Sequence, residues 1–361
     1  MALGVRPLVG VVVMDGLLAS TGIGSLPFLD IDTACRFVAD ARLDLSFWPQ
    51  LPRRDFRELM VPQFAEALPC LQISLADKRV WLDLSDPDRK ADALAAFYER
   101  YLAGDLELGH TSPEHAAGLY AFLDELSATG RRHPQLKGHV TGPMTMALGL
   151  NDQDQRPICY DADVFDCVIK LVEVKARWQA ARLRDHCDRV VILLDEPVLS
   201  AFGSSAYVSI NEEQVIGAIN QSVEPLQADG VVAGVHCCGN TDWAMFLRSR
   251  VDVVSFDAFQ YAASLALYPE ALAAFLDRGG LLAWGLVPTL VATGTETVEQ
   301  LHQVWADALD ALTAKGIPAD QVVRQSLLTP SCGTGSLSEP AARTAFKLLA
   351  ELRDRLKTEL G

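Results

Sequence analysis

The sequence is poor in positive charge, and this limits the partners it can bind. Its 361 residues include 31 lysines and arginines against 47 aspartates and glutamates, a formal net charge of −16. No run of basic residues is present, so binding to a nucleic acid backbone is not expected. The sequence also lacks an apolar run of about 18 residues, which a membrane-spanning helix requires. We therefore expect neither a nucleic acid partner nor a membrane.

The eight cysteines lack the spacing of a disulfide framework or of a zinc finger. Only Cys237 and Cys238 are adjacent, and no C-x₂-C pair occurs. Disulfide frameworks are typical of small secreted proteins, so we expect free thiols and a cytoplasmic location. The apolar segment after Arg6 is similar to the core of a signal peptide, but Asp15 interrupts it. We expect this segment to lead into the first strand.

The chain also lacks a Pro/Gly/Ser-rich linker that would divide it. Short aliphatic runs instead alternate with long amphipathic segments, of which 161–186, 297–315 and 339–356 are the clearest helices. Nearly continuous apolar runs are typical of strands that are buried on both faces. Eight such strands alternating with helices predict a (β/α)₈ TIM barrel of the α/β class. The eight runs are 17–27, 44–52, 136–145, 189–197, 230–239, 251–259, 280–288 and 322–333.

One segment interrupts this alternation. The stretch "LQISLADKRVWLDLSD" (71–86) alternates like a β-hairpin whose turn is "ADK". With two helices up to about Gly130, it predicts an excursion at about 70–130, between the second and third strands of a single catalytic domain over 1–361. The alternative is a separate doubly wound domain. Against it, no glycine fingerprint for a dinucleotide follows any predicted strand.

Candidate metal ligands follow three of the predicted strands. His236 and Cys238 end the fifth strand, and because they are two residues apart their side chains point to the same side. The Cys237 side chain points the other way, into the barrel wall, where we expect it to have only a packing role. Asp257 ends the sixth strand and Cys332 the eighth, at the end of the barrel where active sites lie. Two thiolates and an imidazole suit zinc, and the alternative is a set of buried core residues.

Several motifs together resemble the catalytic barrel of cobalamin-independent methionine synthase. They are "TGIGSLP" near the start, "LLDEPVLS" after the fourth strand, H-x-C after the fifth, an acidic residue after the sixth, and a cysteine before the glycine of "TPSCG". The motifs "HCCGNT" and "GPMT" also resemble uroporphyrinogen-decarboxylase-like methyltransferases, which move methyl groups from cobalamin proteins to thiols. The motifs run in the right order over nearly the whole chain.

The resemblance implies roles for particular residues. His236, Cys238 and Cys332 would be catalytic zinc ligands. The synthase has a glutamate as fourth ligand where this chain has Asp257, whose shorter side chain leaves its coordination open; the decarboxylase-like group often has an aspartate there. The substrate-binding residues would be Ile23, Gly24 and Ser25 for the carboxylate of homocysteine, and Asp195 for its ammonium group, with Glu196 as the next candidate.

The resemblance also implies a reaction, the methylation of a zinc-bound homocysteine thiolate to give methionine. Full synthases carry a second barrel, whereas about sixteen residues precede the first strand here. We therefore expect a short "core" form whose methyl donor is methylcobalamin on a partner corrinoid protein. The alternatives are a coenzyme M-type or other thiol methyltransferase, a folate-dependent synthase, and a zinc-binding structural barrel. Uroporphyrinogen decarboxylase itself binds a polyanion, which suits an acidic chain poorly.

One histidine is left without a role by these motifs. His139 in "GHVTGP" lies within the third predicted strand. It either faces the mouth of the barrel or is a core histidine with its hydrogen bonds satisfied.

Overall fold

The computed structural model describes residues 18–203, 210–291 and 294–360. The apolar segment after Arg6, with its Asp15, lies outside the described residues. Eight parallel strands form one curled sheet in the order β1-β10-β9-β8-β7-β6-β5-β2. Each overlaps one of the eight predicted runs, although β5 and β6 begin three and two residues before theirs: β1 (Ala19–Ser20), β2 (Ser46–Phe47), β5 (His133–Thr141), β6 (Cys187–Asp195), β7 (Val232–Cys237), β8 (Val253–Phe256), β9 (Leu281–Val287) and β10 (Ser326–Pro330).

The two end strands of this sheet meet, which gives the barrel. Parallel bridges join Thr21 to Leu45 and Ser25 to Gln50. The Gln50 amide donates to the Gly24 carbonyl over 3.1 Å, and the Leu26 amide donates to the Gln50 carbonyl over 2.8 Å. The predicted α/β TIM-like barrel is confirmed.

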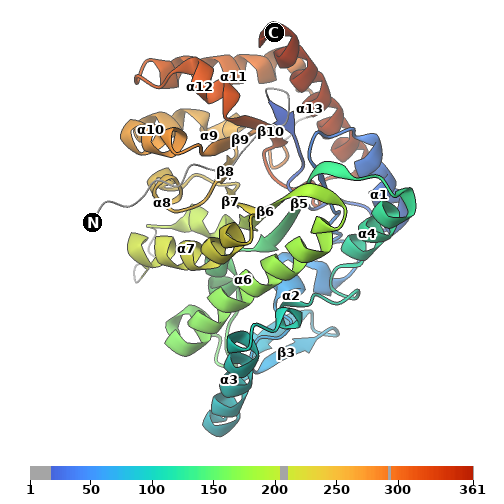
Figure 1. The fold of residues 1–361 in the computed structure, drawn as a ribbon, viewed down its shortest axis with the longest axis vertical. Helices are drawn as coiled ribbons and strands as arrows, with labels where there is room; N and C mark the ends of the chain where they lie inside the picture. The colour runs from blue at the N-terminus through green and yellow to red at the C-terminus, as the bar shows by residue number, and fades with distance from the viewer. Residues whose placement is uncertain (1–17, 204–209, 292–293, 361) are drawn as a thin grey trace.

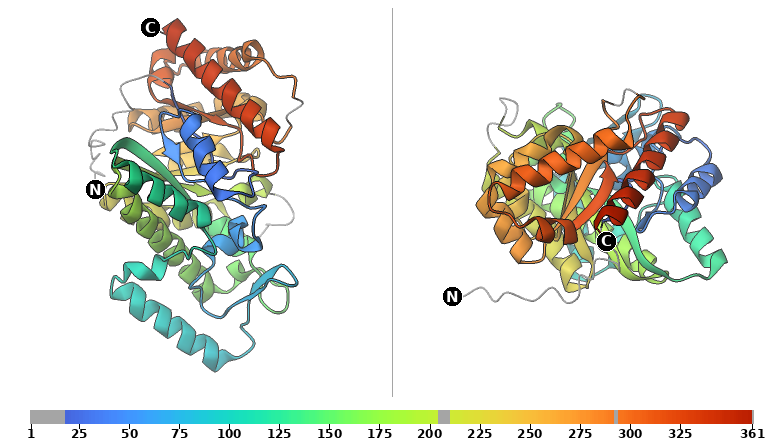
Figure 2. Two further views of the ribbon diagram at one scale, coloured as in Figure 1. Left: turned by 90° about the vertical axis from the view of Figure 1, so that its right-hand side faces the viewer. Right: turned by 90° about the horizontal axis from the view of Figure 1, so that it is seen from above.

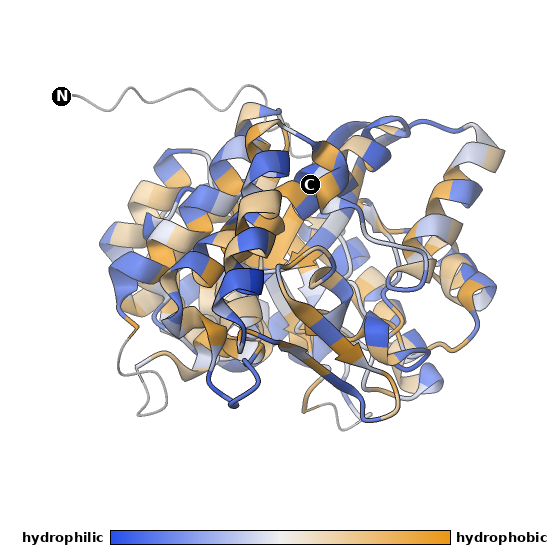
Figure 3. Cartoon of the chain, turned by 90° about the horizontal axis from the view of Figure 1, so that it is seen from below, coloured by the Kyte–Doolittle hydropathy of each residue, from blue (hydrophilic) through white to orange (hydrophobic). Residues whose placement is uncertain are grey.

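Helices cover the outside of the sheet (Figures 1 and 2). In Figure 3 they carry both hydrophilic and hydrophobic positions, as helices between a core and water do. Asp161 and Thr297 cap two of the predicted helices with their side chains. The helices are α1 (Ile31–Asp40), α2 (Met60–Phe64), α3 (Pro87–Leu102), α4 (Ala117–Thr129), α5 (Pro143–Gly149), α6 (Ala162–Arg184), α7 (Glu212–Ala228), α8 (Trp243–Arg248), α9 (Ala258–Tyr261), α10 (Pro269–Asp277), α11 (Val298–Thr313), α12 (Ala319–Arg324) and α13 (Glu339–Leu360). None of the helices described is both long and apolar enough to cross a membrane.

The predicted excursion is present between β2 and β5, the third strand of the barrel. Strands β3 (Leu71–Ser74) and β4 (Arg79–Leu82) pair antiparallel, and α3 projects from the end of the molecule below them (Figures 1 and 2). The Tyr101 hydroxyl donates to Glu173 over 2.5 Å and so ties α3 to α6. Helix α4, which ends at Gly130 in the left-handed conformation, packs on α1. It therefore belongs to the outer layer of the barrel.

The interior of the barrel changes character along its axis. A small apolar cluster fills its lower part: Ala19, Leu45, Val191, Leu193, Val253, Leu281, Ala283 and Leu327. Toward the carboxyl ends of the strands, the strand register aligns one row of polar residues, in which Thr141 pairs with Asp195, Asp195 with His236 and His236 with Ser255. Because paired residues of parallel strands share a face, these side chains lie above the apolar cluster. The register thus places polar chemistry at one mouth of the barrel.

Candidate functional site

The structure brings three predicted ligands together at this mouth. The ligand atoms of His236, Cys238 and Cys332 all lie within 4.8 Å of one another. The first two lie at the end of β7, and Cys332 follows β10. Cys237 is turned to the outer core, where burial raises the pKa of its thiol to about 12. Its predicted packing role is confirmed.

The His236 ring is held as a metal-ligating histidine is usually held. Its Nδ1 lies 2.9 Å from the Ser255 hydroxyl on β8, whereas its buried Nε2 has no partner among the described residues. A hydrogen bond at one nitrogen fixes the ring and leaves the other free to bind a metal. The orphaned Nε2 therefore fits a metal ion at this place.

The two thiols of this group interact with each other. A hydrogen bond between Cys238 and Cys332 lowers the pKa of Cys238, with help from His236, and raises that of Cys332 well above its usual value. The pair therefore favours one negative charge between the two sulfurs. Two cysteine sulfurs and one imidazole nitrogen are a donor set that suits zinc and leaves a coordination position for a substrate.

Asp257, the fourth candidate ligand, is not part of this group. Its carboxylate caps α9, accepting the Gln260 amide at 3.0 Å and the Gln260 side chain at 2.8 Å. Burial raises its pKa. This carboxylate therefore has a local role in the turn at the end of β8. The negative charge of Cys238 also raises its pKa.

Asp195 and Glu196 are adjacent but differ in their partners. Asp195 is buried, burial raises its pKa to about 6, and its Oδ1 has no partner among the described residues. Glu196 accepts hydrogen bonds from the Met144 amide at 2.9 Å and from the amide and hydroxyl of Thr145, both at 2.7 Å. Glu196 thus fixes the "GPMT" turn, and Asp195 is left open to a cationic group.

The segment Ile23 to Ser25 lies between the other elements of the site. The Ile23 carbonyl accepts a 2.5 Å hydrogen bond from the buried Lys137 ammonium group. The Ser25 carbonyl accepts the Thr334 amide at 2.8 Å, and the Ser25 hydroxyl accepts the Gly335 amide at 3.3 Å. The predicted carboxylate-binding segment is therefore tied directly to the loop that carries Cys332.

Sequence reasoning missed Lys137 and Ser255. Lys137 is fully buried on β5, where burial lowers its pKa to about 8. A lysine inside a run predicted to be a buried barrel strand was a visible signal, since lysine is almost never buried without a partner. Ser255 carried no such signal, because its role depends on the register of β7 with β8.

Unpartnered polar atoms gather at this mouth. Seven buried side-chain atoms lack a hydrogen-bond partner among the described residues, and five of them are on barrel strands: His139 Nδ1 and Nε2, Asp195 Oδ1, His236 Nε2 and Thr329 Oγ1. Buried polar groups are nearly always hydrogen-bonded, so each exception calls for an explanation. The clustering of these unpartnered atoms indicates that a polar ligand binds there.

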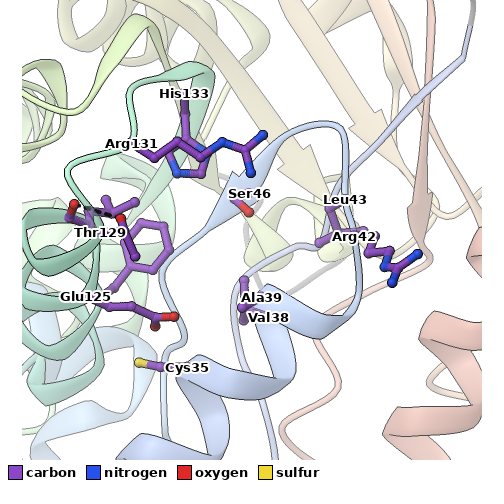
Figure 4. A pocket seen from close by; sticks show the side chains of 12 residues that line it. Cys35, Val38, Ala39, Arg42, Leu43, Ser46, Glu125, Thr129, Arg131 and His133 are labelled. Carbon is purple, nitrogen blue, oxygen red and sulfur yellow. Dashed lines mark hydrogen bonds between the residues drawn. The ribbon is translucent and has the colours of Figure 1, made fainter.

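A cavity of about 520 Å³ lies elsewhere, between α1 and α4 and at the starts of β2 and β5 (Figure 4). Arg42, Glu125, Arg131 and His133 are among its lining residues, and none of the predicted site residues is. It lies at the amino ends of the strands, whereas barrel active sites lie at their carboxyl ends. This cavity is therefore not the candidate site.

Comparisons with known proteins agree with the resemblance at the level of fold. No family model and no curated protein matches this sequence. Among solved structures, a B12-independent methionine synthase from Shewanella sp. W3-18-1 in complex with selenomethionine matches with a TM-score of 0.57 at 17% identity, over 95% of this chain and 99% of that chain. A methyltransferase from Methanosarcina mazei matches with a TM-score of 0.57 at 15% identity, over 95% of each chain.

A further solved structure is of the same kind. The putative vitamin-B12 independent methionine synthase from Listeria monocytogenes matches with a TM-score of 0.57 at 16% identity, over 90% of this chain and 85% of that chain. At such low sequence identities the similarity shows a shared fold. This chain thus has the barrel fold of B12-independent methionine synthases and related methyltransferases over nearly its whole length.

Proposed function

We propose that this protein is a zinc-dependent thiol methyltransferase that makes methionine from homocysteine. The observation that carries the proposal is the convergence of His236, Cys238 and Cys332 beside the open carboxylate of Asp195. Zinc held by these three residues would lower the pKa of a substrate thiol bound to it and hold that thiol as a thiolate. The free state of all eight cysteines supports a reducing compartment such as the cytoplasm.

The charges around the site favour an amino acid as the methyl acceptor. Asp195 offers a buried negative charge on β6, and Lys137 a buried positive charge beneath the Ile23 to Ser25 segment. A zwitterion such as homocysteine complements both charges, with its ammonium group on Asp195 and its carboxylate at that segment. Coenzyme M carries a sulfonate and no ammonium group, so it would leave Asp195 without a partner, at a cost that disfavours its binding.

For the methyl donor we propose methylcobalamin carried by a corrinoid protein. The homocysteine sulfur would attack the methyl carbon, forming the S–C bond while the electrons of the Co–C bond stay on cobalt as Co(I). Large exposed apolar side chains in the segments after the strands support the docking of a partner there: Leu29, Leu59, Tyr160, Leu267, Leu290 and Val291. A net charge of −16 is unfavourable to a polyglutamyl folate, which is itself a polyanion.

The donor is tested with the purified, zinc-loaded protein and homocysteine. We expect methionine to form from free methylcobalamin, slowly because the contacts of a carrier are missing, and little or none to form from methyltetrahydrofolate or its triglutamate. Mass spectrometry of the product is the measurement. Turnover with methyl-folate at a rate equal to or above that with methylcobalamin would overturn the donor and leave the zinc-thiolate chemistry standing.

Two further outcomes of this assay bear on the alternatives. Preference for coenzyme M over homocysteine would overturn the acceptor. Zinc bound without methylation of any thiol by either donor would contradict the enzymatic proposal and favour a structural barrel.

A further inference from the structure

The His139 ring on β5 is buried without a hydrogen bond at either nitrogen. Its exposed fraction is 1%, and both Nδ1 and Nε2 lack partners among the described residues. His236 and His115, the other buried histidines with an orphaned nitrogen, each keep a partner at Nδ1. A neutral imidazole has one N–H donor and one acceptor nitrogen, so His139 leaves both unsatisfied. That arrangement destabilises the empty protein unless a ligand completes it.

The ring is nevertheless held firmly in place. It stacks on Trp48 with a centroid separation of 4.1 Å and an interplanar angle of 18°. Gln179 of α6 accepts the His139 amide at 2.9 Å, donates to the His139 carbonyl at 3.0 Å, and accepts the Trp48 indole N–H at 3.0 Å. Because ring and backbone are both fixed, the nitrogens are oriented by the protein and are not free to turn toward other partners.

The end of the ring that carries both nitrogens lies beside the segment predicted to bind the substrate carboxylate. A Cβ added to Gly24 would lie 2.7 Å from Nδ1 and 3.0 Å from Nε2 of His139. Gly24 therefore packs against the face of the ring beside Cε1 and the two nitrogens. Only a glycine leaves room for this approach.

The charges beside His139 favour an anionic ligand group. Lys137, two residues earlier on the same face of β5, holds the Ile23 carbonyl. Burial and the charge of Lys137 both lower the pKa of His139, so the ring is neutral. A neutral ring keeps one N–H, and a carboxylate near Lys137 is the group that would accept it.

We propose that His139 donates a hydrogen bond to the carboxylate of the amino-acid substrate and thereby selects amino-acid thiols over thiols without a carboxylate. This inference rests on the proposed function, because it takes the substrate to be homocysteine and the product methionine. It assigns His139 as a substrate-binding residue on β5, beside Lys137 and one strand away from Asp195 on β6. A site built to hydrogen-bond a substrate group discriminates strongly against the analogue that lacks that group.

The test compares the binding of two ligands by calorimetry. They are methionine and 3-(methylthio)propylamine, which is methionine without its carboxylate. For His139→Leu we expect the affinity for methionine to fall tenfold or more and the affinity for the amine to stay within twofold of the wild type. His139→Gln, which keeps a donor, should recover part of the methionine affinity. His133→Leu, at the far end of β5, is the matched control and should bind both ligands like the wild type.

Thermal unfolding provides a second readout. Without ligand, His139→Leu should melt at or above the temperature of the wild type, because the variant buries no unpaired nitrogen. An equal loss of affinity for both ligands, a clear fall in the melting temperature of the empty variant, or a wild type that does not bind methionine would overturn the inference. Binding does not need methyl transfer: methionine binding that depends on His139, in a protein without methyltransferase activity, would contradict the proposed function alone.

Discussion

Replacing Cys238 or Cys332 by serine is expected to remove the zinc and abolish homocysteine methylation while the barrel stays folded. Both sulfurs belong to the group of ligand atoms within 4.8 Å of one another, and each supplies one of only two thiolates in the set. A serine oxygen is a far poorer zinc ligand than a thiolate. The fold does not depend on the ion as small zinc domains do, because the core between the sheet and its helices is large.

The measurement is zinc content per chain, with circular dichroism and thermal unfolding as the test of folding. Cys237→Ala is the matched control, since this neighbouring thiol faces the outer core and should leave the zinc in place. Asp257→Asn should lower the zinc content less than either cysteine replacement does, because this carboxylate caps α9. Full zinc content in both serine variants would refute the ligand assignment.

Asp195→Asn is expected to raise the KM for homocysteine tenfold or more. The carboxylate is buried and its Oδ1 has no partner among the described residues, so the substrate ammonium group would complete a buried charge pair. Loss of one partner from such a pair costs about 2 to 5 kcal/mol, which exceeds a factor of ten. The asparagine keeps the size of the side chain, so the rate at saturating homocysteine should change much less than KM.

A desamino substrate separates this effect from general damage to the site. The wild type should handle 4-mercaptobutyrate, which is homocysteine without its ammonium group, poorly, and Asp195→Asn should close most of that gap. If the variant instead handles homocysteine with an unchanged KM, Asp195 does not bind the ammonium group. Steady-state kinetics with both thiols is the measurement.

The barrel could be predicted from the sequence because its strands are buried on both faces. Such strands leave aliphatic runs, and each of the eight runs overlaps one strand. The lengths were not predictable in the same way: β1 and β2 have two residues each, whereas their runs span eleven and nine. The remaining residues of these runs, such as Ile23 to Ser25, form the connections that carry the site.

The ligand triad was predictable because each member ends a strand, and strand ends of a barrel converge. The contribution of Ser255 was not, since it depends on the register of β7 with β8. Lys137 had a signal in the sequence, but its contact with the Ile23 carbonyl joins distant segments and was not predictable. The local role of Asp257 had a signal in the sequence, namely the Asp-x-x-Gln spacing of a helix cap, which Gln260 completes.

The central claim is that this site binds zinc and brings a substrate sulfur to it. X-ray absorption at the zinc edge, on the purified wild type with and without homocysteine, tests that claim most directly. We expect about one zinc per chain, two sulfurs at about 2.3 Å together with nitrogen in the free protein, and a third sulfur when homocysteine is added. Protein purified without chelator that holds no zinc, or zinc whose sulfur count does not change with homocysteine, would contradict the account.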